Sequence, residues 1–438
     1  MDRKEFLSSE YGIDCSGTVL VTEKLQALID DAAAAGGRAV LKRGTYLTGA
    51  LFLKSGLEFT MEEGCILKGT TDESQYPLIE TRVAGIEMKW PAAVLNCNHQ
   101  RGVSVTGKGV INGQGPYWWE KYWGKDRKGG MRGEYDAKGL RWAADYDCTR
   151  VRNVVIFDSS EVLLKDFTSE QSGFWNVHIC YCSHVHVDGI RIAGNAGSPS
   201  TDGIDIDSSS HVLVENCETS CDDDSICIKS GRDADGLRTA RPSHHITIRN
   251  CRIHAGFGVT LGSELSGGIE DVIIRDLQYE GTDCGFRIKS SRPRRGYIKN
   301  ILVENLQMKN VKYPFHICLD WNPAYCTCEL PDGYEGEVPE SWRKLLEPVP
   351  EDEPLTHVSN ITVRNVRAEN DAGYSGISRA FDIEGYREQP IESVKFSDIH
   401  MSVREFGRIS YVKELQMDHV TIEVAGDRDT ANDTYDNR

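Results

Sequence analysis

The sequence predicts an all-β fold, a single-domain right-handed parallel β-helix with a short N-terminal capping helix. Two observations favour this fold. A short phrase recurs eight times between Ser160 and Met401, and each phrase alternates apolar with polar residues. A unit that recurs about every 20–50 residues is typical of a solenoid. Alternation with a period of two is typical of a strand that buries one face.

The recurring phrases define the strands. They read SEVLLKDF, SHVHVDGI, SHVLVENC, HHITIRNC, EDVIIRDL, KNILVENL, SNITVRNV and ESVKFSDI. The third residue of each is β-branched, as strands favour. These residues are Val162, Val185, Val212, Ile246, Val272, Ile301, Ile361 and Val394. Their spacings are 23, 27, 34, 26, 29, 60 and 33 residues, so the longest interval spans two coils or one coil with an insertion.

A bend follows each strand. The seventh residues of the phrases all belong to types that tolerate a left-handed backbone. They are Asp166, Gly189, Asn216, Asn250, Asp276, Asn305, Asn365 and Asp398. The eighth residues return to the interior and include Cys217 and Cys251, so packing explains these cysteines. The competing leucine-rich repeat would need leucines at fixed positions and a regular period of about 20–29 residues.

The rest of the chain fits a solenoid over residues 1–424. Residues 22–35 (TEKLQALIDDAAAA) predict a helix that would cover the open end of the core. Residues 112–147, rich in aromatic side chains, and residues 318–357, rich in proline, interrupt the repeat as inserted loops. Loops on a rigid scaffold usually carry binding functions. Residues 425–438 are polar and are expected to be disordered.

Composition excludes several classes of function. Of the 438 residues, 27% are charged and 39% hydrophobic, as in ordinary globular chains. The net charge of −17 speaks against binding of nucleic acid or anionic membranes. No apolar run is long enough to span a membrane. The opening residues MDRKEFLSSEYGIDCSG lack the apolar core of a secretory signal, so a cytoplasmic location is expected. No motif for a cofactor occurs.

The 14 cysteines are expected to be free thiols in the cytoplasm. Cys180 and Cys182 form one C-x-C pair, and Cys326 and Cys328 form another. A zinc site at these pairs is one interpretation. Buried small side chains are the favoured one, because the usual spacing of zinc ligands is absent, and no metal is expected.

Two adjacent coils hold the densest acidic residues. STDGIDID covers residues 200–207, and CDDDSICIKSG covers residues 221–231. Asp202 precedes Asp223 by 21 residues and Asp224 by 22, about one short coil, so stacking can bring the three carboxylates together. Carboxylates forced together hold different pKa values, which supplies an acid and a base in one site. A solvated acidic surface and a calcium site are the alternatives.

Basic residues follow the carboxylates. Arg287 and Lys289 lie two residues apart on a strand-like run and therefore point to the same side. An arginine and a lysine side by side suit recognition of a sugar carboxylate. Salt bridges to the acidic surface are the competing interpretation, above all for Arg292, Arg294 and Arg295.

The order of four segments, STDGIDID, DDDSICIKSG, GFGVTLGSELSGG and FRIK, strongly resembles glycoside hydrolase family 28, the polygalacturonase family. The resemblance covers nearly the whole chain and implies a β-helix that hydrolyses α-linked galacturonate or related pectic bonds with inversion. It implies Asp223 as the general acid, with Asp202 and Asp224 holding and deprotonating the attacking water. Inversion is expected to need about 6.5–9.5 Å between acid and base. The resemblance also implies that Arg287 and Lys289 grip a galacturonate carboxylate.

The chain departs from the family's Gly-His-Gly motif, where Phe257 replaces the histidine. His254, three residues earlier, is a candidate for binding substrate, as are Phe257 itself and, in the matched segments, Lys229 and Glu264. Three explanations of Phe257 stay open: a different substrate such as rhamnogalacturonan fragments, another histidine in this role, or lost catalysis. The first is favoured, because the three aspartates and the Arg-x-Lys pair are present. The segment GSELSGG resembles exo-acting members.

The expected activity is exo-acting release of galacturonate from acidic pectic oligosaccharides. An exo-enzyme needs a pocket closed at one end, and the inserted loops 112–147 and 318–357 are candidates for its wall. Trp118, Trp119 and Trp142 could stack on sugar rings or pack inside their loop. Two other functions stay open, a calcium-dependent lyase that cleaves galacturonate by β-elimination and a non-catalytic carbohydrate-binding β-helix. The sequence leaves the oligomeric state open.

Overall fold

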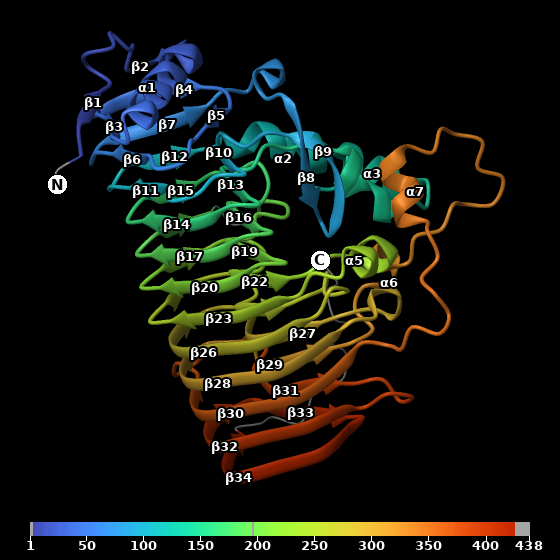
Figure 1. The fold of residues 1–438 in the computed structure, drawn as a ribbon. Helices are drawn as coiled ribbons and strands as arrows, with labels where there is room; N and C mark the ends of the chain where they lie inside the picture. The colour runs from blue at the N-terminus through green and yellow to red at the C-terminus, as the bar shows by residue number, and fades with distance from the viewer. Residues whose placement is uncertain (1–2, 195–196, 425–438) are drawn as a thin grey trace.

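The computed structural model describes residues 3–194 and 197–424. The chain forms a parallel β-helix, in which coils stack along one axis from β1 near the N-terminus to β34 at the far end (Figure 1). Strands of neighbouring coils pair in parallel. The predicted fold class is therefore confirmed.

Two long sheets carry the coils. The 11-stranded sheet, which bears the site described below, consists of β5 (Leu51–Phe52), β10 (Leu95–Asn98), β13 (Val154–Phe157), β16 (Val177–Cys180), β19 (Ile204–Asp207), β22 (Ile226–Lys229), β25 (Val259–Leu261), β27 (Cys284–Lys289), β29 (Tyr313–Cys318), β31 (Arg379–Glu384) and β33 (Glu405–Ser410). The 21-stranded sheet consists of β1 (Glu5–Leu7), β2 (Ser16–Leu20), β3 (Arg38–Leu41), β4 (Gly44–Thr48), β6 (Glu58–Met61), β7 (Cys65–Gly69), β11 (Ser104–Thr106), β12 (Val110–Asn112), β14 (Ser160–Lys165), β15 (Thr168–Glu170), β17 (Ser183–Asp188), β18 (Arg191–Ala193), β20 (Ser210–Glu215), β21 (Glu218–Ser220), β23 (Ser243–Arg249), β24 (Arg252–Ile253), β26 (Ile269–Glu280), β28 (Tyr297–Lys309), β30 (His357–Glu369), β32 (Ile391–Val403) and β34 (Val412–Val424).

The repeat columns stack residue on residue. The first column pairs in register through Val162, Val185, Val212, Ile246, Val272, Ile301, Ile361 and Val394. Ile301 pairs directly with Ile361, so the 60-residue interval is one coil with an insertion. The eight bend residues all have positive φ, from 53° at Asn365 to 66° at Gly189. Glycine and short polar side chains therefore occupy the corner where the backbone is left-handed.

The two ends of the solenoid differ. Helix α1 (Thr22–Ala34) covers the N-terminal end and buries Leu25, Leu28 and Ile29 completely. At the other end β34 is the last strand of the described coils (Figure 1). Residues 425–438, which the sequence predicts to be disordered, lie outside the described residues.

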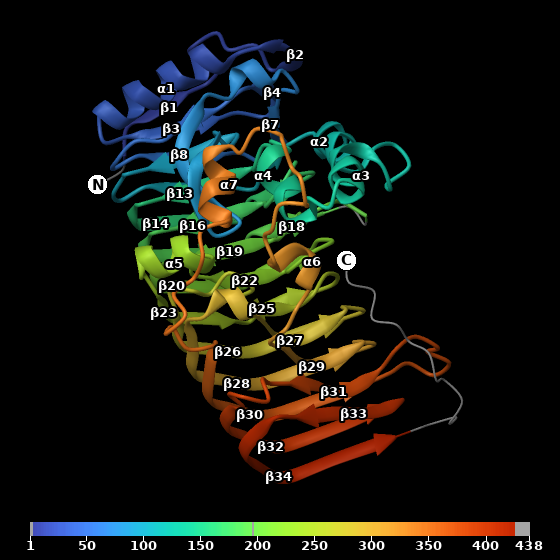
Figure 2. The same cartoon turned by 90° about the vertical axis from the view of Figure 1, so that its right-hand side faces the viewer.

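The first inserted stretch is largely helical, which its high aromatic content did not predict, whereas the second is mostly loop with two short helices. The first contains α2 (Gly115–Trp123), α3 (Gly130–Ala137), η2 (Arg141–Ala143) and α4 (Ala144–Asp147), and the second contains α6 (Pro323–Cys326) and α7 (Glu340–Leu345). The other short elements are η1 (Glu73–Gln75), α5 (Asp233–Thr239), η3 (Arg292–Arg294) and the antiparallel hairpin of β8 (Leu78–Val83) and β9 (Ile86–Pro91). In Figure 2, α4, α6, α7 and β8 lie over the 11-stranded sheet. Within the described ranges, no helix has the length and apolar character needed to cross a membrane.

All 14 cysteines are free thiols. The sulfurs of Cys326 and Cys328 accept hydrogen bonds from Arg294 at 3.4 Å and Arg232 at 3.1 Å. Cations therefore lie beside this C-x-C pair. The cysteines buried in or beside the core include Cys180, Cys182, Cys217 and Cys251.

Candidate active site

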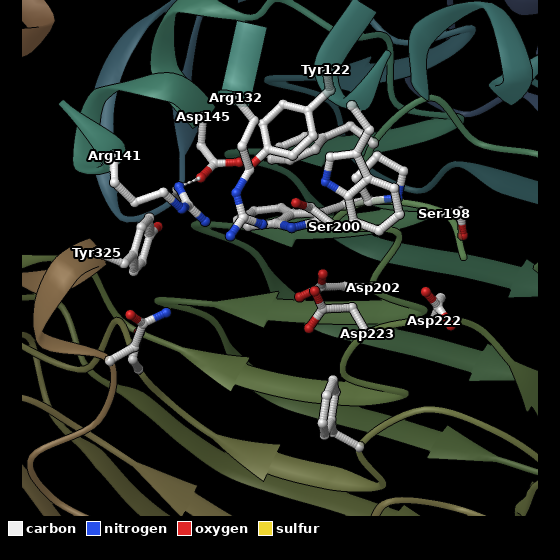
Figure 3. A pocket seen from close by; sticks show the side chains of 18 of the residues that line it. Tyr122, Arg132, Arg141, Asp145, Ser198, Ser200, Asp202, Asp222, Asp223 and Tyr325 are labelled. Carbon is white, nitrogen blue, oxygen red and sulfur yellow. Dashed lines mark hydrogen bonds and ion pairs between the residues drawn. The ribbon is translucent and has the colours of Figure 1, made fainter. Parts of the chain in front are cut away.

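Three carboxylates meet where two coils enter the 11-stranded sheet. Asp202 precedes β19, and Asp223 and Asp224 precede β22. Ile204 pairs with Ile226, an offset of 22 residues, which sets Asp202 beside Asp224. One oxygen of each of the three carboxylates lies within 4.8 Å of the others. Figure 3 shows Asp202 and Asp223 together at the surface of a pocket.

The surroundings shift the pKa values of Asp223 and Asp224 in opposite directions. Burial and then the negative charge of Asp224 raise the pKa of Asp223 to about 6. Burial would also raise the pKa of Asp224. Lys289 Nζ at 2.6 Å and Arg287 Nη1 at 3.5 Å outweigh that effect and hold the pKa of Asp224 well below its usual value. Asp223 therefore keeps its proton up to a higher pH than an ordinary aspartate does, while Asp224 stays ionised.

A second buried cluster supports the first. Lys229 Nζ lies 3.3 Å from Asp202, 3.5 Å from Asp205 and 3.3 Å from Glu264. Burial and the charge of Asp205 raise the pKa of Asp202 well above its usual value. Burial also raises the pKa of Asp205 to about 7. Asp205 was missing from the predicted site, although it stands three residues after Asp202 in STDGIDID.

The stacking of the coils brings the three carboxylates together. Asp202 and Asp224 occupy neighbouring coils, which lie about 4.8 Å apart, and Asp223 is next to Asp224 in the chain. The nearest oxygens of the three groups therefore lie within 4.8 Å of one another.

Aromatic rings hold the two cations of β27. The Arg287 guanidinium lies 4.5 Å from the centre of the Phe257 ring, and Lys289 Nζ lies 4.6 Å from that of Trp321. Both cations are almost fully buried. The backbone N–H of Phe257 also donates to the carbonyl of Asp223 at 3.0 Å. Phe257 therefore contacts both the Arg287 guanidinium, which lies beside Asp224, and the backbone of Asp223.

A cavity of about 660 Å³ opens above the carboxylates. Its lining includes Asp202, Asp223, Arg287 and Lys289 on the coils. The inserted helices contribute the opposite wall, where Arg132 extends toward the carboxylates (Figure 3). Cations therefore face the cavity from both sides, which suits an acidic ligand.

Part of the chain matches the model of a known protein family. Residues 79–333 match the family described as Glycosyl hydrolases family 28. The chain belongs to this family.

Relatives of known name agree with the family 28 assignment. A "Probable polygalacturonase" of Vitis vinifera is 27% identical over 381 residues, or 81% of this chain and 73% of that protein. An "Exo-poly-alpha-D-galacturonosidase" of Dickeya chrysanthemi is 25% identical over 69% of this chain and 55% of that protein. The crystal structure of a hyperthermoactive exopolygalacturonase from Thermotoga maritima matches with a TM-score of 0.78 and 26% identity, over 97% of this chain and 93% of that chain.

Of the sequence-predicted binding residues in this family 28 chain, Lys229, Glu264 and Phe257 line the cavity. His254 follows β24 in the 21-stranded sheet, is exposed and does not line the cavity, so its assignment is wrong.

The sequence leaves two roles open for Trp118, Trp119 and Trp142, and the structure favours packing inside the molecule over stacking on sugar. Trp118 and Trp142 are 1% and 2% exposed. Each of the three indoles donates its N–H to a backbone carbonyl at 2.9–3.1 Å, and none of them lines the cavity. Trp175 and Trp321 line it instead. Trp175 lies in SGFWNV, one coil before Asp202. Trp321 lies in the inserted stretch 318–357.

Proposed function

We propose that the chain is an exo-acting glycoside hydrolase that releases galacturonate from the non-reducing ends of pectic oligosaccharides. The observation that carries this proposal is the trio of buried Asp202 and Asp224 with half-buried Asp223, in which the pKa of Asp223 is raised and that of Asp224 is lowered. Relatives named polygalacturonase and exo-poly-alpha-D-galacturonosidase support a galacturonate substrate. The cations that line the cavity support an acidic one.

In this mechanism Asp223 donates its proton to the glycosidic oxygen as the bond from that oxygen to the anomeric carbon breaks. A water molecule held by Asp202 and Asp224 attacks the anomeric carbon and loses a proton to Asp224. Proton exchange with solvent then returns both carboxyl groups to their starting states. Each turnover therefore consumes one water and releases one sugar.

Arg287 and Lys289 connect substrate binding to the base. Both cations contact Asp224, Arg287 at 3.5 Å and Lys289 at 2.6 Å. The carboxylate of a galacturonate unit would compete with Asp224 for them. Losing part of this pairing raises the pKa of Asp224 and makes it a stronger base when substrate is present.

The way in which Asp224 is held supports inversion. Substrate binding removes only part of its pairing with Lys289 and Arg287, and the pairing that remains makes Asp224 a poorer nucleophile than a free carboxylate, so water is the favoured attacker. The stereochemistry of the product tests this directly. Proton NMR of the first product should show the β-anomer from an α-linked substrate, whereas an initial α-anomer would establish retention.

Exo-action is supported by the inserted helices, which wall the cavity above the coils. Phe257 presents an apolar ring where the family motif has a histidine. An apolar surface suits a leaving sugar with a methyl group, as in rhamnogalacturonan fragments. We therefore propose these fragments alongside oligogalacturonides as substrates.

A calcium-dependent lyase is less well supported. Asp202, Asp223 and Asp224 could together face a cation, but Lys229 and Lys289 already lie within 3.3 Å of the carboxylates. Two ammonium groups at that distance repel a divalent ion.

The test is incubation of the purified protein with oligogalacturonides and with rhamnogalacturonan-I oligosaccharides, in EDTA, followed by chromatography. Single galacturonate units from non-reducing ends are expected. An unsaturated product absorbing in the ultraviolet would establish a lyase. Binding without any product would establish a carbohydrate-binding protein.

A further inference from the structure

The C-terminal end of the solenoid exposes side chains of the interior columns. Leu415 and Met417 of β34 stack on Val394 and Phe396 of the preceding coil. The two residues of the preceding coil are each 2% exposed, but Leu415 is 38% and Met417 is 42% exposed. Val424, at the end of the same strand, is 51% exposed. The interior columns therefore continue into the last described coil without a described coil to cover them.

We define this terminal face by Leu415, Met417, Val420, Ile422 and Val424. An apolar surface of this kind usually marks an interaction site. Terminal coils of solenoids need a polar cap, and β34 alternates apolar residues with charged ones instead.

Few of the residues printed after β34 are apolar. The residues that follow β34 read AGDRDTANDTYDNR, and Tyr435 is the single large apolar residue among them. Such a composition has little apolar surface to match the rows of leucine, methionine and valine that the face presents.

We propose that a second copy of this chain packs end to end against the terminal face, around a two-fold axis. A two-fold axis brings the same apolar columns of two copies together, which is the simplest way to match their spacing. The two-fold axis also places the two β34 strands antiparallel to each other, and exposed edge strands pair readily in this arrangement.

Charge permits such a contact, and topology limits the assembly to two copies. The outward residues of β34 carry both signs, with Lys413 and His419 against Glu414, Asp418 and Glu423. Mixed signs allow opposite charges to meet across the axis. At the other end α1 buries its leucines against the core, so each chain has one such end to offer. Association through one end closes at a dimer.

The test is light scattering coupled to gel filtration on the full chain over a hundredfold range of concentration. A mass twice that of one chain is expected for the wild type. The double variant Leu415→Lys, Met417→Lys should have the mass of one chain. Gln416→Lys, on the same strand between the two interior columns, should remain a dimer. Hydrolysis per chain should be equal in all three, because the terminal face is remote from the carboxylates.

Hydrogen exchange gives a second measurement that needs no variant. Amides of β34 should exchange more slowly at high protein concentration than at low concentration, while those of β14 should not change. A wild-type chain that stays monomeric with concentration-independent exchange overturns the proposal. So does a dimer that survives the double substitution. Dimers formed only after deletion of residues 425–438 would assign that segment as the cover and also overturn it.

Discussion

The coils that carry the carboxylates and the coils that follow them share one repeat, but they bury their outward-facing charged side chains to different extents. Arg287 on β27 and Arg408 on β33 occupy the same position along the sheet, since the register passes from one to the other through His316 and Asp382. Arg287 is 3% exposed, whereas the side chain of Arg408 is 56% exposed. The repeat therefore supplies the position of a side chain, and some other part of the chain supplies its burial.

The inserted helices and the β8–β9 hairpin make this difference. They lie over the strands of the site coils and leave the last coils open (Figure 2). Under that cover, water screens the charged groups less, so they interact more strongly. The pKa values of neighbouring carboxyl groups therefore move apart. The burial of the charged groups at the site therefore depends on the insertions as much as on the coils. Buried charges also cost stability, because desolvation opposes their pairing.

The largest expected effect is loss of the acid. Asp223→Asn should lower kcat by a factor of about 10²–10⁴, because the leaving oxygen is no longer protonated. The measurement is release of reducing sugar, with circular dichroism to show that the fold persists. Asp222→Asn is the matched control, an adjacent carboxyl group that should cause a much smaller loss. An active Asp223→Asn enzyme contradicts the assignment of Asp223 as the acid.

The pH profile should report the same group. Asp223 must be protonated to act, and its pKa is raised to about 6. As the pH rises through 6 the protonated fraction falls, so kcat/KM should drop about tenfold per pH unit above that value. Measurement of kcat/KM between pH 4 and 8 tests this. A profile that stays flat to pH 8 would show that the acid has another pKa or another identity.

A core substitution should separate the two regions. Ile361→Ala, in the coils beyond the site, removes a residue that is 1% exposed and should cost about 2–5 kcal/mol in the free energy of unfolding. Its kcat should not change at temperatures where the protein is folded. Ile206→Ala, at a fully buried position of β19, should cost as much and also lower kcat. Equal loss of kcat in both variants would show that the coils act as one cooperative unit in catalysis.

The next effect concerns the ring that replaces the family histidine. Phe257→Leu keeps an apolar side chain but removes the aromatic face beneath Arg287. The lost cation–π contact of about 0.5–2 kcal/mol corresponds to an increase in KM of about two- to thirty-fold, with a smaller change in kcat. Phe257→Tyr keeps the face and should behave like the wild type. A change in kcat alone would mean that Phe257 acts on the Asp223 loop rather than on Arg287.

The fold could be predicted almost completely, because the repeat is local and each coil repeats the same strand and bend. Stacking by one coil also predicts that Asp202, Asp223 and Asp224 meet. The spacing of 22 residues did not give their separation, which the distance between strands sets.

The aromatic lining could not be predicted from the repeat. Trp321 reaches the cavity from an inserted stretch, while Trp118 and Trp142 are held by packing and by backbone carbonyls. Sequence shows that such residues are abundant in the insertions. Which of them face the cavity depends on tertiary contacts between the insertions and the coils, and these carry no periodic signal.

The smallest expected effect tests whether burial of charge costs the site coils stability. Asp205 is fully buried, and its pKa is raised from an ordinary 3.8 to about 7. Above pH 7 the folded protein carries this unfavourable charge, and as the pH falls from 7 toward 4 protonation relieves the cost. Asp205→Asn removes that cost, so its melting temperature should exceed that of the wild type at pH 8, and the difference should shrink as the pH falls. Asp382→Asn is the control in the later coils, where Arg408 pairs with the carboxylate at 2.9 Å, and it should not gain stability at pH 8. If Asp205→Asn is instead less stable at pH 8, the ion pair with Lys229 outweighs desolvation, and the site coils do not lose stability through this charge.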